Sequence, residues 1–122
     1  MTSEALLCLE YLGISRNDPS LAAGSKYLAQ HLPGSGGITS YYMYYGTQVS
    51  FHVQGDLWKK WNEAMKKNLL STQIKKNHMA GTWNPSDAWE NQAGRLFGTS
   101  LRLLMLEIYY RHLPLYTNIK VE

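Results

Sequence analysis

Residues 2–10 read TSEALLCLE, and residues 99–107 read TSLRLLMLE, so that six positions match at a constant offset of 97 residues. A third segment opens in the same way at Thr39 and Ser40 and continues into aromatic residues. Internal similarity of this kind is typical of stacked helical arrays. The repeat therefore predicts an all-α fold assembled from similar helical units.

Two kinds of helix alternate along the chain. Residues 5–12, 41–53 and 101–110 are apolar on nearly all sides, and such helices must be covered by neighbours on several faces. Residues 56–72 place apolar side chains at helical spacing opposite a face of lysines, and residues 20–31 are a weaker version of this pattern. The order predicts inner helices shielded from water by outer ones, as in antiparallel helical hairpins packed in a curve.

Turn-forming residues separate these helices. Asp18 before Pro19 combines a capping side chain with a proline suited to the first helical turn. Residues 77–92 form a long polar connection, Gly94 precedes the last helix and Pro114 ends it. Because no stretch alternates with a period of two, we expect almost no strand.

Size and charge exclude several classes of protein. The chain of 122 residues fits one domain, residues 1–122, and its net charge of +3 is too modest to predict a nucleic-acid partner. No segment is long and apolar enough to predict a membrane span. Met1 leads into polar residues without a basic segment, so no signal peptide is expected and the location is cytoplasmic if the chain is complete.

A short motif connects the end of one helix to the following loop. Leu69 and Gln73, followed by Gly81 and Trp83, resemble the QW repeat of squalene and oxidosqualene cyclases, with a longer gap between Gln73 and Gly81. In that motif the glutamine hydrogen-bonds backbone near the next helix, and the tryptophan covers the outer seam. The resemblance implies the α/α-toroid that these cyclases share with the beta subunits of protein prenyltransferases.

The flanking sequence extends this resemblance. Residues 41–48 (YYMYYGTQ) are similar to the start of an inner helix in bacterial prenyltransferase and squalene-oxidase repeat proteins of unassigned function. Residues 94–116 are similar to the C-terminal inner helix and tail of the same group, so that residues 39–116 are covered. The family's closed ring needs more helices than the three inner and two outer ones found here. We therefore expect an incomplete toroid whose bare apolar surface requires a homo-oligomer or the remainder of a longer chain.

The catalytic motifs of these families are absent. The resembled cyclases use an Asp-x-Asp-Asp motif, whereas Asp18, Asp56 and Asp87 are each isolated. The prenyltransferases hold zinc through Asp, Cys and His, but Leu6 stands two residues before Cys8, and no pair of histidines has the spacing of metal ligands. We expect no catalytic residue, metal or cofactor in this chain.

Aromatic residues are the best candidates for a ligand site. Tyr41, Tyr44 and Tyr45, together with His52 and Glu107, are predicted to line a concave face. Aromatic faces can stabilise carbocations or stack on sugars, and the resemblance implies an isoprenoid or other apolar ligand. The competing interpretation is packing between helices, because clustered tyrosines on one helix cannot all face the same way.

Glu10 and Glu107 occupy the same position of the repeat, each within an apolar helix. A buried carboxylate needs a partner, for which Arg95, Arg102 or a helix N-terminus is available. We favour a structural role for Glu10 and Glu107 in the packing of the repeat. The alternative is an acid with a raised pKa that faces the lumen of the toroid.

Two functions follow as hypotheses. The first is a non-catalytic helical-repeat domain that acts in packing or partner binding, since the sequence holds no acid motif, metal set or nucleophile. The second is part of a terpenoid cyclase or prenyltransferase-like enzyme whose catalytic motif lies outside this chain. Saccharide binding rests on the aromatic residues alone, and neither His78 nor the connection 77–92 is assigned a role.

Overall fold

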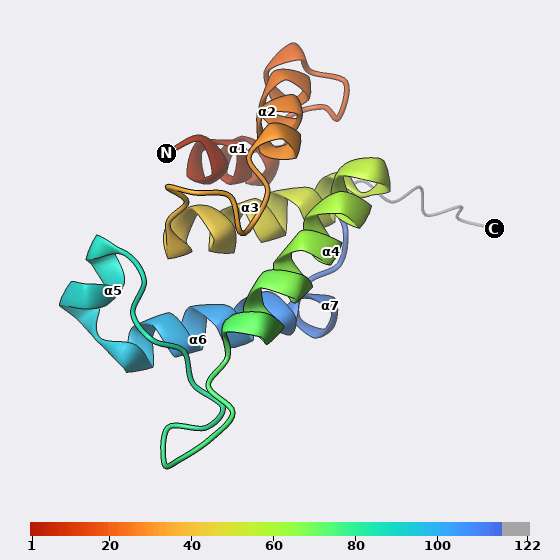
Figure 1. Cartoon of the computed structure of the whole chain (residues 1–122). Helices are drawn as coiled ribbons and strands as arrows, with labels where there is room; N and C mark the ends of the chain where they lie inside the picture. Colours follow the sequence, from red (N-terminus) through yellow and green to blue (C-terminus); the bar gives the residue numbers. More distant parts are fainter. Residues whose placement is uncertain (116–122) are drawn as a thin grey trace.

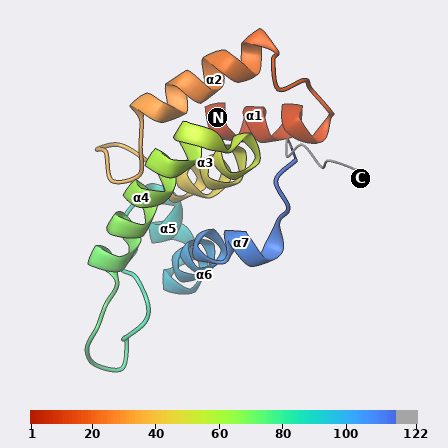
Figure 2. The ribbon, with the colours of Figure 1, turned by 90° about the vertical axis from the view of Figure 1, so that its right-hand side faces the viewer.

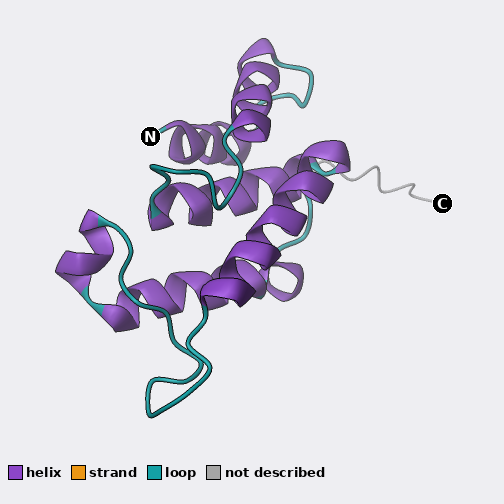
Figure 3. Cartoon of the chain, in the orientation of Figure 1, coloured by secondary structure: helices purple, strands orange, loops and turns teal. Residues whose placement is uncertain are grey.

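The computed structural model describes residues 1–115 and contains seven helices in that range (Figure 1). They are α1 (Thr2–Tyr11), α2 (Pro19–Gln30), α3 (Ser40–Val53), α4 (Gly55–Thr72), α5 (Ala88–Ala93), α6 (Arg95–Leu106) and α7 (Ile108–Arg111). No strand occurs within the described residues (Figure 3), so the prediction of an all-α protein is confirmed. Tyr116, the last residue of the resemblance, lies outside them.

Three helices form an inner layer and run in the same direction. α3 lies in the middle, with α1 packed on one side and α6 on the other (Figure 1). Near the starts of α3 and α6, the rings of Tyr41 and Phe97 lie 5.6 Å apart. Near the ends of α1 and α3, the rings of Tyr11 and His52 lie 5.9 Å apart. These are the helices for which the sequence predicts burial on several sides.

α2 and α4 form a second layer over the first (Figure 2). The direction of α4 follows from its contacts with α3. Phe51 lies 5.2 Å from Trp58, centroid to centroid, and Thr47 lies 3.5 Å from the sulfur of Met65, so α3 and α4 are antiparallel. No helix of the described part is long and apolar enough to cross a bilayer.

The seam between α3 and α4 is built around Trp61, which is 0% exposed. Its indole Nε1 donates to Oγ1 of Thr47 at 3.0 Å, and that hydroxyl donates to the carbonyl of Met43 at 2.7 Å. Gly46 leaves room for the ring, because a Cβ built there would stand 2.5 Å from Cη2 of Trp61. The interface therefore depends on one large side chain facing one residue without a side chain.

The C-terminal third of the chain differs from the sequence-based expectation. A short helix, α5, lies inside the connection 77–92, because the Asp87 carboxylate accepts from the backbone N of Glu90 at 2.9 Å and caps the helix. The other Asp87 oxygen accepts from the backbone N of Ser40 at 2.6 Å. The last inner helix begins at Arg95, directly after Gly94 as predicted, so the apolar segment 101–110 is only part of it. It ends before Glu107, where α7 follows, and does not continue to Pro114.

We predict that Gly46→Ala destabilises the protein by about 1–2 kcal/mol. Overpacking costs about 1–3 kcal/mol, because the rigid Trp61 ring cannot move aside, and it exceeds the gain in helix propensity of about 1 kcal/mol. Urea unfolding followed by circular dichroism measures the difference. Gly36→Ala is the matched control, since a Cβ there has no neighbour within 4 Å. Equal stability of the two variants would contradict the proposed seam.

Candidate functional site

The three tyrosines predicted to bind a ligand lie together at the start of α3. The rings of Tyr41 and Tyr45 are stacked at 6.3 Å with an interplanar angle of 8°, and Tyr44 meets Tyr45 at 5.1 Å. Trp89 of α5 contacts Tyr41 edge-on at 5.7 Å, and Phe97 of α6 adds a further ring. We call these five residues the aromatic cluster. Trp89 was missed at the sequence level because the connection 77–92 gave no sign of a helix.

The structure does not bring His52 and Glu107 into this cluster. His52 is 1% exposed near the other end of α3, next to the rings of Tyr11 and His112. Burial, and then the neighbouring His112, lowers the pKa of His52 to about 4. Glu107 is exposed at the junction between α6 and α7. The best-formed cavities within residues 1–115 are lined by none of the five predicted ligand residues.

The residues of the QW-like motif do meet. Nε2 of Gln73 donates to the carbonyl of Gly81 at 3.0 Å, which closes the loop that follows α4. Trp83 is buried, and its Nε1 donates to the carbonyl of Leu69 at 2.8 Å, satisfying an acceptor in the last turn of α4. The glutamine thus bonds backbone in its own loop and not at the start of the next helix, where the resemblance places that bond.

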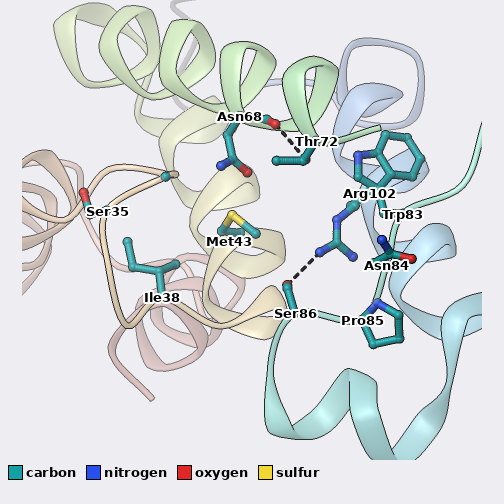
Figure 4. Close-up of a pocket in the computed structure, with 11 residues that line it drawn as sticks. Ser35, Ile38, Met43, Asn68, Thr72, Trp83, Asn84, Pro85, Ser86 and Arg102 are labelled. Carbon is teal, nitrogen blue, oxygen red and sulfur yellow. Dashed lines mark hydrogen bonds between the residues drawn. The ribbon is translucent and has the colours of Figure 1, made fainter. Parts of the chain in front are cut away.

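A cavity of about 470 Å³ lies beside Trp83, between α4, the loop at residues 34–38 and the segment 83–86 (Figure 4). Met43 and Ile38 form part of its wall, and Asn68 and Asn84 contribute amides. The face of the Trp83 indole is not available for stacking, because this side chain is 1% exposed. The cavity is therefore a polar recess with some apolar wall.

Arg102, in the wall of this cavity, is neutralised by Glu90. Both of its terminal nitrogens contact the carboxylate, with 3.1 Å between Nη2 and Oε2, and Nη2 also donates to the Ser86 hydroxyl at 3.0 Å. Arg95 donates instead to the carbonyl of Trp83 at 3.0 Å. The expectation that one of these arginines pairs with Glu10 or Glu107 is therefore wrong.

Glu10 is 3% exposed, and neither of its carboxylate oxygens has a hydrogen-bond partner among residues 1–115. Burial raises the pKa of Glu10 to about 8. A carboxyl in this setting favours its neutral form near pH 7, which avoids burying an unpaired charge. The raised pKa of Glu10 agrees with the second interpretation, an acid with a raised pKa. Glu107, its counterpart in the repeat, is exposed.

The two copies of the repeat bury opposite sides of their helices: residues that are buried in α1 have counterparts in α6 that face outward. In α1 the buried residues are Ser3, Leu6, Leu7 and Glu10. Their counterparts on α6 and its C-terminal end are exposed or half-buried: Ser100, Leu103, Leu104 and Glu107. An exposed stripe therefore runs along α6 and α7 at spacings of three and four residues, and we call it the α6 open face. Its members are Leu96, Ser100, Leu103, Glu107 and Tyr110.

Comparison with known proteins gives no match: no family model, curated protein or solved structure resembles this chain. Within the described residues, no three His, Cys, Asp or Glu side chains gather closely enough to hold a metal ion.

We predict that Trp83→Phe lowers the free energy of unfolding by about 1 kcal/mol, because the carbonyl of Leu69 loses its indole donor and keeps only those from the backbone N of Gln73 and the Thr72 hydroxyl. Trp89→Phe is the control, since the Trp89 side chain is 54% exposed; its effect should stay within about 0.5 kcal/mol. Thermal unfolding of the two variants makes the comparison. Equal losses would show that the indole of Trp83 does not secure the end of α4.

We predict that stability falls by about 2 kcal/mol between about pH 6.5 and 8.5 because of Glu10. The folded pKa of about 8 lies above the unfolded value of 4.5, so the folded state holds a proton that the unfolded chain has released, and rising pH favours unfolding. The lowered pKa of His52 reduces the stability of the fold only below pH 6.5, the unfolded pKa of this side chain, and so outside this window. Glu10→Gln should flatten the profile, whereas Glu63→Gln, at an exposed site on α4, should not. Parallel profiles for wild type and Glu10→Gln would refute the assignment.

Proposed function

We propose that this chain is a non-catalytic helical-repeat module, part of an α/α-toroid of the terpenoid cyclase and prenyltransferase type, and that it works by packing against a partner. The observation that supports this proposal is the α6 open face. Leu96 is 81% exposed, Leu103 44% and Tyr110 90%, whereas Leu6, the counterpart of Leu103 on α1, is buried. Exposed apolar side chains aligned on one side of a helix and flanked by polar ones favour an interaction surface.

The layered arrangement supports the same proposal. Parallel inner helices flanked by outer helices can be extended by further units at either end of the layer, as in other repeat proteins. Burying one exposed leucine is worth about 1.5–3 kcal/mol, so two leucines on one stripe can contribute substantially to association. The chain meanwhile offers no group of acids or metal ligands in its described part that would favour a reaction.

A second candidate function is favoured by the aromatic cluster. Tyr41, Tyr45 and Trp89 converge from α3 and α5 on the partly exposed N-terminal end of the inner layer. In a closed ring, rings at this place would face an apolar or cationic ligand. On this view the chain is part of a terpenoid cyclase or prenyltransferase-like enzyme, and adjoining sequence should carry an Asp-x-Asp-Asp motif or a set of Asp, Cys and His.

Light scattering of the purified chain tests the first proposal. We expect a concentration-dependent mass above that of the monomer, and we expect the double variant Leu96→Lys and Leu103→Lys to weaken association by about tenfold or more. Leu70→Lys is the matched control, because Leu70 is 52% exposed on α4 and is not a member of the α6 open face. A wild-type chain that stays monomeric, or equal weakening by the control, would contradict the proposal.

A further inference from the structure

We infer that the partner of the α6 open face is the exposed side of α1 in a second copy of this chain, in a head-to-tail arrangement. This inference rests on the proposed function and names the partner for the same surface. It is carried by the repeat, which relates the two ends of the inner layer to each other at a fixed offset of 97 residues.

The first half of the argument concerns α6. Ser3, Leu6 and Glu10 lie on the buried side of α1, where α2 and α3 pack. The residues that correspond to them, Ser100, Leu103 and Glu107, lie on the α6 open face. α6 therefore presents the kind of face that α1 uses toward the following helices of the layer, but no described helix covers it.

The second half concerns α1. Its exposed residues Met1, Ala5, Cys8 and Leu12 follow at spacings of four, three and four residues, and we call them the α1 open face. At the same offset they correspond to Gly98, Arg102, Met105 and Tyr109. Of these, Gly98, Arg102 and Met105 are buried in α6, and Tyr109 contacts Trp58 with 5.5 Å between ring centroids. α1 therefore presents the kind of face that α6 turns toward the preceding helices.

Each open face is thus the counterpart of a face that is covered at the other end of the same chain. Joining the α6 open face of one copy to the α1 open face of the next brings together the two kinds of face that are buried on α1 and on α6 within a single chain. The join also keeps the parallel direction shared by α1, α3 and α6.

The shape of the α1 end fits a row of leucines. A shallow cavity of about 520 Å³ lies between α1 and α2, beside the α1 open face. Small residues, Ala5, Ala23 and Gly24, form part of its lining, with Leu9 and Tyr27. A groove of small side chains accepts the larger Leu96 and Leu103 of a neighbouring α6. Because such a contact uses two different faces, repetition leads to a ring or to a filament.

A disulfide cross-link tests this arrangement, because Cys8, the single cysteine of the chain, already lies on the α1 open face. A chain carrying Leu103→Cys and Cys8→Ser is mixed with wild type under mild oxidation. A disulfide forms only where the two Cα atoms come within about 7 Å. We expect a covalent dimer in the mixture and none from either protein alone. Leu70→Cys with Cys8→Ser is the control and should give several-fold less adduct. Both cysteine substitutions are at exposed positions, and circular dichroism verifies that the variants fold.

The remaining outcomes separate this inference from the proposal on which it rests. A covalent dimer from the Leu103→Cys chain alone would indicate symmetric pairing of two α6 open faces and would overturn the head-to-tail arrangement. Association by light scattering with no more mixed adduct than the control would also overturn it, while the packing function would stand. A wild-type chain that stays monomeric by light scattering would overturn both.

Discussion

The packing of Trp61 against Gly46 is the constraint on which the rest of the structure depends. The indole is fully buried and hydrogen-bonded to Thr47, so it fixes both the rotation of α4 about its axis and its position along α3. α3 in turn contacts α1, α2, α4, α6 and α7. A shift of α3 would therefore disturb both neighbours in the inner layer as well as the outer layer. Within the inner layer, α1 and α6 each pack against α3 on one side only, so the opposite side of each helix is left as an open face.

The helices that could be predicted are those whose signal is local. α4 is indicated by the spacing of its lysines on one face, and the start of α2 by the cap that Asp18 forms before Pro19. Both signals come from neighbouring residues, and both features are present in the structure. The meeting of Gln73 with Gly81 and of Leu69 with Trp83 was also accessible, since a motif resemblance brought the four residues together. The clustering of Tyr41, Tyr44 and Tyr45 follows from their position on one helix.

The features that could not be predicted depend on distant contacts. Asp87 caps α5 through the backbone N of Glu90, but its other oxygen accepts from the backbone N of Ser40, 47 residues away, so the placement of α5 against α3 depends on a distant contact. Arg102 pairs with Glu90 because Gly98 admits the carboxylate beside the helix, where a Cβ would stand 2.7 Å from it. The repeat shows that Glu10 and Glu107 are equivalent in sequence, but burial depends on which end of the layer each helix occupies. That information is not local, and so one carboxyl is buried and the other is exposed.

Hydrogen exchange of the native protein tests most directly whether α3 is the element that organises the others. Amides of α3 from residue 44 onward should exchange only through global unfolding, because neighbours cover this helix on both sides within its layer and from the outer layer. Amides of α5 and α2 should exchange faster, through local opening, since fewer elements pack on them. Exchange from α3 at the same rate as from α5 would contradict the account.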